Sequence, residues 1–233
     1  MARINKSALT KLEIIRVASR MFLEKSYSAT TIKAISSELE MSTGNLTFYF
    51  HSKEHLLAEL VELLGAFQRK MMDLEADEGL SSLMAICLEL AVMAAMCEEN
   101  AVAKDFYLST YSSSMTLTII RKNDVERARQ VFGPSLPDWT EENFREAEVL
   151  VSGVEYATLM TTENGPTLET RIAGALKTIM QIYQIPEETQ TLKIERVLAM
   201  DYRGISRRVF REFIKFVEQN NEHAIEALLT PNK

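Results

Sequence analysis

The chain is poor in residues that interrupt helices and in residues that crosslink them. Its 233 residues include only 8 glycines, 5 prolines and 2 cysteines. So few helix breakers favour long helices over a fold rich in turns. Cys87 and Cys97 lie ten positions apart on one predicted helix. That separation is too great for a disulfide within the helix, and we expect two reduced, buried thiols.

Sequence signals for membrane insertion, export and catalysis are also lacking. No apolar run approaches the ~18 residues of a membrane-spanning helix, and residues 1–16 lack the apolar segment and cleavage site of a signal peptide. We therefore predict a cytoplasmic protein with no membrane contact. We find no Gly-rich phosphate loop and no catalytic set, and the chain has only three histidines. His51 and His55 lack a third ligand, so we expect no enzyme activity, no metal and no cofactor.

The charge is distributed unevenly along the chain. The net charge at pH 7 is -7, yet residues 1–53 contain eight basic and four acidic side chains, a net charge of +4. The remaining 180 residues therefore total -11. A basic N-terminal segment on an acidic body can bind phosphates with one end only.

Apolar periodicity predicts short helices in the N-terminal segment. Thr30 or Thr31 can cap the second of them, Ser42 can cap the third, and Ser52 can cap the fourth. Apolar side chains recur at three- and four-residue steps in each, as one buried helix face requires. The four predicted helices cover about 7–25, 31–38, 43–49 and 53–74.

The acidic body is also predicted to be helical. Residues 80–98 are apolar on almost every side, which indicates a buried helix. The clearest break is the stretch 132–137, which contains one glycine and two prolines. Further helices are predicted at about 101–112, 115–132, 138–162, 167–184 and 187–219, the last bent or broken near Gly204, with a short helix possible at about 221–229.

One set of residues between positions 10 and 64 agrees, in order and without a gap, with a known signature. These residues are Ile15, Ala18, Phe22, Tyr27, Thr31, Ile35, Gly44, Asn45, Leu46, Phe50, Ser52, Lys53, Glu54, His55 and Leu56. In these positions the chain resembles the TetR family of bacterial transcriptional regulators. The resemblance implies an all-α fold with a three-helix DNA-binding head at 1–54 and a larger helical effector-binding and dimerisation domain at 55–233. It also implies that the last two long helices pair in a homodimer.

The resemblance places the second helix of a helix-turn-helix in the major groove of double-stranded DNA. There Asn45 could pair with an adenine edge, Thr47 could touch a thymine methyl group, and Gly44 would let the backbone approach the bases. The complete set of implied DNA contacts is Thr31, Lys33, Ser42, Thr43, Gly44, Asn45, Thr47, Phe48, Tyr49 and Lys53.

Some positions carry further expectations from the family. Thr31, Tyr49 and Lys53 occupy places where the family contacts phosphate. Ser26 and Glu40 replace glycines that are common there. Because glycine tolerates a positive φ and glutamate does not, the turn at Glu40 should either differ slightly or carry a small strain.

The methionines of the body allow two interpretations. At helical spacing they are typical of core, but thioethers also suit an adaptable pocket for an apolar ligand, to which tyrosine and tryptophan would add polar groups. The candidate pocket residues are Met84, Tyr107, Tyr111, Met115, Trp139, Tyr156 and Met160.

These observations favour a dimeric repressor that binds a palindromic operator and is released by a small apolar or amphipathic effector. Two alternatives stay open: a regulator whose body binds a protein partner, and an all-helical enzyme with an accidental helix-turn-helix resemblance. A closed apolar cavity would favour the small-molecule effector, and an exposed apolar groove would favour the protein partner.

Overall fold

The computed structural model describes residues 5–77, 80–160 and 164–230, and every regular element in these ranges is a helix. The all-α prediction is therefore confirmed. The elements are α1 (Lys6–Lys25), α2 (Ile32–Glu38), α3 (Thr43–Tyr49), α4 (Lys53–Asp77), α5 (Ser82–Glu99), α6 (Ala101–Ser112), α7 (Ser114–Phe132), the 3-10 turn η1 (Gly133–Ser135), α8 (Glu141–Leu159), α9 (Leu168–Ile182), α10 (Glu187–Leu198) and α11 (Tyr202–Leu229).

Polar side chains determine where the first three helices begin. Asn5, Thr31 and Ser42 each accept a hydrogen bond at 3.1 Å from the amide three residues ahead. Each bond satisfies an amide that has no partner within its helix. Thr30 does not cap α2, because its side chain is buried and its hydroxyl donates to the carbonyl of Ser26 at 2.7 Å.

Two helix boundaries in the body refine the sequence-based expectation. Thr140 caps α8 in a reciprocal pair with Asn143, and the helix ends at Leu159. Residues 161 and 162, where its last turn was expected, lie outside the described residues. Pro186 stands one position before α10, as its N-cap.

The C-terminal region agrees with the expected break near Gly204 and differs from the prediction beyond it. The chain breaks between Leu198 and Tyr202, ahead of Gly204, and α11 then continues unbroken to Leu229, so the separate short helix is absent. Asp201 caps α11 by accepting the Gly204 amide at 2.9 Å. A Cβ on Gly204 would lie 2.1 Å from that carboxylate. The glycine therefore permits a tight helix start instead of a bend.

Helix α5 is the centre of the body. It is buried on almost every side, as its apolar sequence indicated, and it is covered by α4, α6, α8, α9, α10 and α11. Cys87 and Cys97 lie on it, free and buried, which confirms the expected state of both thiols. Burial raises their pKa values to about 11 and about 12.

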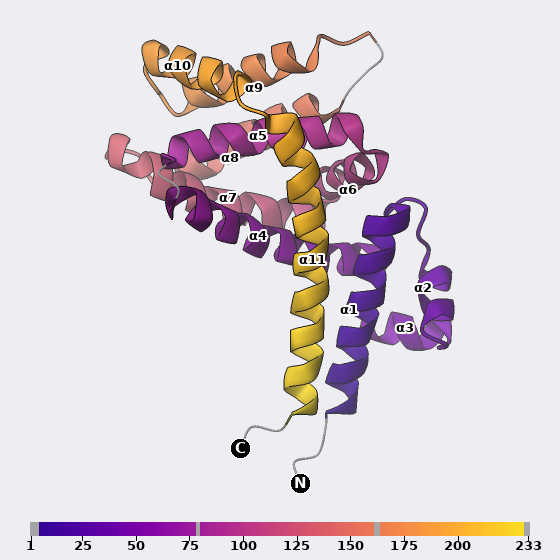
Figure 1. The fold of residues 1–233 in the computed structure, drawn as a ribbon. Helices are drawn as coiled ribbons and strands as arrows, with labels where there is room; N and C mark the ends of the chain where they lie inside the picture. The colour runs from indigo at the N-terminus through magenta and orange to yellow at the C-terminus, as the bar shows by residue number, and fades with distance from the viewer. Residues whose placement is uncertain (1–4, 78–79, 161–163, 231–233) are drawn as a thin grey trace.

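Helices α1, α2 and α3 form a head beside the body (Figure 1). Phe22, Ile35 and Leu46 meet in its core, together with Leu57 and Leu60 from α4. Helix α4 therefore belongs to the head at its start and to the body further on. The domain boundary expected at residue 54 falls in the first turn of this continuous helix.

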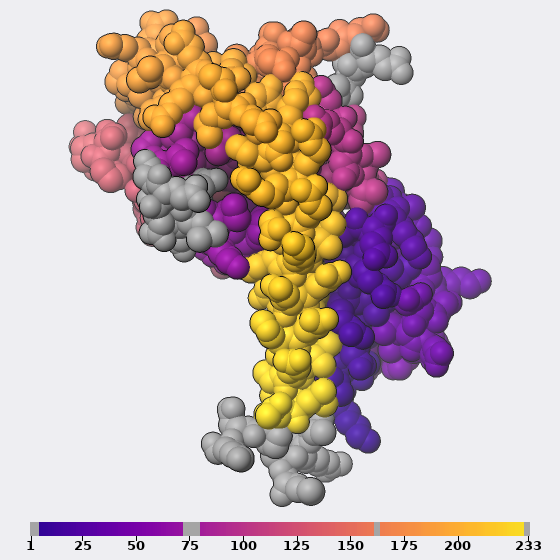
Figure 2. Space-filling model, viewed as in Figure 1, coloured from indigo at the N-terminus to yellow at the C-terminus, as the bar shows by residue number. Residues whose placement is uncertain are grey.

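Helix α11 also joins the two parts. It starts on the body and runs down the length of α1, which places the end of α11 beside the start of α1 (Figure 1). Figure 2 shows α11 crossing the front of the molecule from the body to the head. Both α4 and α11 thus connect the interior of the body to the head.

Two turns of the head hold non-glycine residues in the left-handed region. Ser26 has φ 79° at the end of α1, and Glu40 has φ 52° between α2 and α3. Glycine adopts such values freely, whereas other residues do so at a cost. Of the two outcomes expected for Glu40, the turn keeps a positive φ and the glutamate carries the strain.

Candidate functional sites

The outer face of α3 is polar and open to solvent. Thr43, Gly44 and Asn45 are exposed, and Thr47 is half-buried. Leu46, on the opposite side of the same helix, is completely buried. The core therefore holds this seven-residue helix from behind while its polar face stays free.

Hydrogen bonds within α3 determine which groups of this face are available. The Thr47 hydroxyl donates to the carbonyls of Thr43 and Gly44, at 3.1 Å each. Its proton is therefore used inside the helix, and its methyl group is left for an outside contact. Among the described residues, the side-chain amide of Asn45 has no hydrogen-bond partner, so its donor and acceptor are both available.

Gly44 faces open space. A Cβ added at this position would meet nothing within 4 Å. The packing of the protein itself does not require a glycine here. The small residue instead lets an external surface approach the backbone of α3.

The aromatic run that ends α3 divides into three environments. Phe50 is buried in the head, as expected from the sequence, whereas the side chain of Phe48 is 75% exposed. Tyr49 is half-buried and packs edge-to-face on Phe48, with ring centroids 5.4 Å apart. Phe48 is thus a large apolar side chain displayed next to the polar face.

Lys53 has a structural role that the sequence did not indicate. Its ammonium donates to the carbonyls of Tyr27 at 2.9 Å and Thr30 at 3.0 Å, and lies 4.0 Å from the centre of the Tyr27 ring. It therefore clamps the α1–α2 connection onto the start of α4 and keeps one N–H for a further partner. Thr31 and Lys33 are exposed nearby on α2 and its cap.

Three small cavities adjoin one another in the body. All three are lined by Glu89 and Met93, and their unfilled volumes are about 30, 60 and 20 Å³. Pockets for small molecules commonly measure roughly 300–1,000 Å³. A ligand of ordinary size can therefore enter only if the walls of these cavities move apart.

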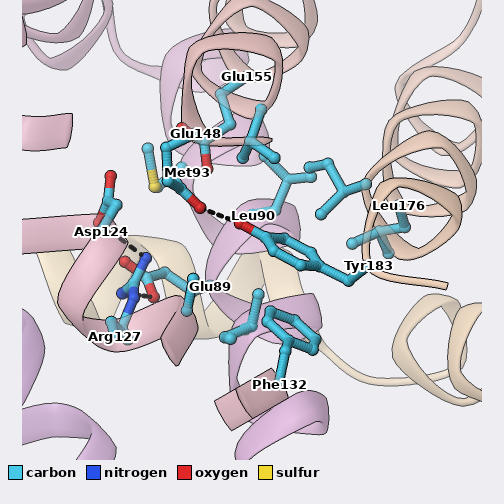
Figure 3. A pocket seen from close by; sticks show the side chains of 14 residues that line it. Glu89, Leu90, Met93, Asp124, Arg127, Phe132, Glu148, Glu155, Leu176 and Tyr183 are labelled. Atoms are coloured by element: carbon cyan, nitrogen blue, oxygen red, sulfur yellow. Dashed lines mark hydrogen bonds and ion pairs between the residues drawn. The ribbon is translucent and has the colours of Figure 1, made fainter. Parts of the chain in front are cut away.

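A cluster of charged side chains faces the first cavity (Figure 3). Arg127 pairs with Glu89 at 2.6 Å and with Asp124 at 3.2 Å. Gln68 donates a further hydrogen bond to Glu89 at 2.5 Å. Helices α5, α7 and α8 contribute the charged members of the cluster, which are Glu89, Asp124, Arg127, Glu148 and Glu155. The cluster therefore holds four carboxyl groups and one guanidinium.

The two glutamates of α8 are paired with tyrosines. Glu148 is 4% exposed and accepts a hydrogen bond from the Tyr183 hydroxyl, and Glu155 accepts one from Tyr111 at 2.7 Å. The Tyr183 ring stacks on Phe132, with centroids 3.9 Å apart and planes 7° from parallel. Within the described part of the chain, neither glutamate forms an ion pair.

The environment of the cluster favours protonated carboxyl groups. Burial raises the pKa of Glu148 to about 7 and that of Asp124 to about 6. Burial, followed by the nearby charge of Asp124, also raises the pKa of Glu155 well above its usual value. The charge of Arg127 opposes these increases without cancelling them. The cavity therefore exchanges protons near neutral pH.

The seven pocket residues predicted from the sequence do not form one site. Tyr107 and Tyr111 line the cavities. The other five do not line the three cavities: they are buried in the core (Met84), packed against other aromatic rings (Trp139 and Tyr156) or exposed (Met115 and Met160).

Sequence reasoning missed the charged cluster, although two signals pointed to it. Glu89 is the only charged residue between positions 80 and 97, and a carboxylate in an apolar helix needs a partner. Glu148 and Glu155 stand seven apart, on the helical face that also carries buried Val151. No local pattern identifies Arg127 as the cation of the cluster, because it comes from another helix.

Neither a metal site nor a membrane-spanning helix is found in the described ranges. No group of three or more His, Cys, Asp or Glu side chains there could hold a metal ion. No helix there is long and apolar enough to cross a membrane. His51 and His55 instead form an edge-to-face ring pair, with centroids 5.9 Å apart.

Comparison with known proteins identifies the head of the chain. A helix-turn-helix head with an exposed polar second helix is joined to a larger helical body that encloses cavities. Residues 14–60 match the sequence model of the bacterial regulatory proteins of the tetR family. Over 68 residues the chain is 40% identical to YerO, an uncharacterized HTH-type transcriptional regulator of Bacillus subtilis (strain 168). That alignment covers 29% of this chain and 24% of the relative.

Over its head, the chain therefore resembles the bacterial regulatory proteins of the tetR family and an HTH-type transcriptional regulator. Two solved structures are similar over most of the chain. The TetR family protein CprB from S. coelicolor A3(2) has a TM-score of 0.44 and 18% identity, over 88% of this chain and 99% of that one. A gamma-butyrolactone receptor, an ArpA like protein, has a TM-score of 0.41 and 18% identity, over 89% and 99%. The resemblance to this family rests on the head alone.

Proposed function

We propose that the protein is a dimeric transcriptional repressor that binds a palindromic operator and leaves it when a small molecule opens the body cavity. The exposed polar face of α3 carries this proposal. Asn45 offers a free donor and acceptor, as an adenine edge requires, and Gly44 allows close approach. Thr31 and Lys33 are exposed at the start of α2, and Lys53 contacts the connection that precedes it, so these side chains are proposed to meet phosphates.

Selection of bound sequences from random duplex DNA tests the DNA-binding role. We expect two inverted half-sites with centres about 34–36 Å apart. Asn45→Ala should lose preference at one base pair per half-site, at a cost of about 1–3 kcal/mol. Lys33→Ala is the matched comparison, because it should weaken binding to all sequences and reduce the salt dependence. An unchanged base preference in Asn45→Ala would refute the recognition role of this residue.

The small size of the cavities supports a link between ligand and head. Leu64 and Phe67 of α4 and Ile205 and Val209 of α11 line the cavity of about 60 Å³. Helix α5 and Tyr107 of α6 line the same space, and we propose that a ligand enlarging it displaces α4 or α11. Both continue into the head, so its position would change with them. The ligand can shift this equilibrium only by its difference in affinity for the two states.

Helix α11 supplies the more direct of the two connections. Beyond the cavity, Val217 and Asn221 are buried and line a cleft that they share with Val17 and Leu23 of α1. The apolar face of α11 is thus occupied by α1, α4 and α5 within one chain. The resemblance had assigned the last long helices to the dimer, and this packing leaves α11 little apolar surface for that role.

Helix α8 offers a better dimer surface. Val149, Leu150 and Met160 are 49%, 54% and 39% exposed. Leu150, Gly153 and Ala157 follow one another on α8 at steps of three and four residues, the spacing of a helix-pairing seam, and Met160 is the C-cap of the helix. A Cβ on Gly153 would meet nothing within 4 Å, so a second α8 can approach closely. We therefore assign the dimer contact to this exposed stripe.

Sedimentation equilibrium of Leu150→Glu tests the assignment. The variant should become monomeric, because it places a charge in the seam. Leu192→Glu on α10 is the control, since Leu192 is 61% exposed and outside the stripe. A dimeric Leu150→Glu would contradict the assignment. A natural chain that is itself monomeric would instead favour a protein partner on this apolar stripe.

A further inference from the structure

The first cavity of the body, of about 30 Å³, is called the body cavity below. Charge is balanced on one side of it and unbalanced on the other. Arg127 makes its ion pairs with Glu89 and Asp124. Glu148 and Glu155 receive only tyrosine hydroxyls. A second guanidinium, that of Arg121 on α7, donates to the Ser152 hydroxyl at 3.0 Å and forms no ion pair with either glutamate within the described ranges.

Glu148 is the most informative side chain of this unbalanced side. It is more than nine-tenths buried, it lines the cavity, and it forms no ion pair in the described chain, although the charges of Arg127 and Arg121 act on it from further away. A buried carboxyl group without a counter-ion must either stay protonated or receive a cation. Tyr111 of α6 and Tyr183, just after α9, can only hydrogen-bond. The group that would complement the two glutamates on this side is therefore a cation.

We propose that the effector is an amphipathic organic cation whose positive nitrogen binds between Glu148 and Glu155 in the body cavity. This inference rests on the proposed function and adds the chemical class of the ligand. Low dielectric strengthens a charge pair at this position. Each glutamate would keep its tyrosine hydrogen bond and gain a counter-ion.

The rest of the cavity suits the apolar part of such a molecule. The stacked rings of Phe132 and Tyr183 form one wall, and Leu90, Met93 and Leu176 stand around it (Figure 3). Aromatic faces attract cations as well as apolar groups. A flat or branched apolar group next to the charged nitrogen therefore matches the lining.

In the structure, where the cavities are closed to a ligand, Arg127 supplies the positive charge of the cluster. With its guanidinium in place the adjoining cavities stay small, at about 30 and 20 Å³. A ligand cation would add a second positive charge near Arg127. Their mutual repulsion would push α7 away from α8 and enlarge the space. The two cations thus connect ligand charge to opening of the body.

A matched pair of probes tests the charge requirement. Phenyltrimethylammonium and tert-butylbenzene have nearly the same shape, and only the first is charged. Calorimetric titration of the full-length protein should give an affinity at least about tenfold higher for the cation. Equal affinities, or tighter binding of the neutral compound, would overturn the proposal.

Two variants of α8 test where the cation binds. Glu148→Gln keeps the shape of the side chain and removes its charge, so the preference for the cation should fall about tenfold. Glu146→Gln on the same helix is the control, because Glu146 is exposed, and it should keep the full preference. If both variants keep it, the nitrogen does not bind where we place it. Tm and circular dichroism show whether each variant is folded.

Proton release supplies an independent readout. Because the pKa of Glu148 is raised to about 7, a bound cation should expel a proton near neutral pH, and the heat of binding should depend on the ionisation enthalpy of the buffer. No proton release with the cationic probe would contradict the assignment. Operator binding that responds to tert-butylbenzene but not to phenyltrimethylammonium would refute this inference and leave the proposed regulatory function intact.

Discussion

The head and the body both concentrate polar side chains, but they hold them in opposite ways. On α3 the polar groups are uncharged and exposed, and the Asn45 amide is unpaired among the described residues. In the body the polar groups are charged, largely buried and bonded to one another, as Arg127 is to Glu89. The head can therefore meet a ligand as it stands. The body must first exchange internal contacts for external ones.

The two regions also differ in what their polar groups do to stability. Exposed groups on α3 remain hydrated, so folding removes little of their solvation. Four carboxyl groups around one guanidinium lose much of their hydration, and burying charge is unfavourable unless it is paired. Changes in the body should consequently affect folding, and changes on α3 should affect binding.

Removal of the central cation should give the largest effect on stability. Arg127→Met leaves Glu89 and Asp124 without a counter-ion, and we expect a loss of about 3 kcal/mol in the free energy of unfolding. Urea denaturation at neutral pH measures it. Arg129→Met is the control, because Arg129 pairs with Glu126 on the surface and should change stability by about 0–1 kcal/mol. Similar losses of unfolding free energy in both variants would show that the charged cluster is as exposed as the surface pair.

The pH dependence of stability should come next in size. The pKa of Glu148 rises from 4.5 to about 7 on folding, so the folded chain holds a proton that the unfolded chain has released. The free energy of unfolding should therefore fall by about 1–3 kcal/mol between about pH 4.5 and pH 7. Glu148→Gln should flatten this decline and Glu146→Gln should not. A stability that rises with pH in this window would contradict the raised pKa.

Substitution of Lys53 should affect the head in both folding and binding. Lys53→Ala removes two hydrogen bonds to the α1–α2 connection, and we expect a loss of about 1–2 kcal/mol. It should also weaken binding to all DNA sequences. Lys33→Ala should weaken binding without lowering Tm, because Lys33 is exposed. An unchanged Tm in Lys53→Ala would argue against the clamp.

The smallest effect on stability should come from Gly44, with the opposite sign. Gly44→Ala adds a methyl group in open space and improves helix propensity, so it should stabilise the chain by about 0.5 kcal/mol. The same methyl group should reduce operator affinity about tenfold. Gly174→Ala on α9, which is equally unobstructed, should stabilise the protein without affecting binding. If Gly44→Ala kept its full affinity for the operator, Gly44 would not be part of the DNA interface.

The agreement between sequence and structure varies with the range of the interactions. Ile35 and Leu46 were expected to face inward from local periodicity alone, and both are completely buried. That Lys53 contacts phosphate stays a prediction, whereas the bonds of its ammonium to carbonyls more than twenty residues away were not expected. The cap at Asp201 was missed because Gly204 resembles a helix break. Contacts within a turn or two of helix could be predicted, and contacts between distant segments could not.

The amino-acid sequence by itself determined the helices, the basic head and the residues displayed on α3. These depend on helical periodicity, capping and composition, which act over a few neighbouring residues. Only the tertiary structure decided that α11 packs along α1 and that Arg127 meets carboxylates from other helices. Charge pairing in a protein interior depends on which helices come together, and no stretch of sequence contains that information.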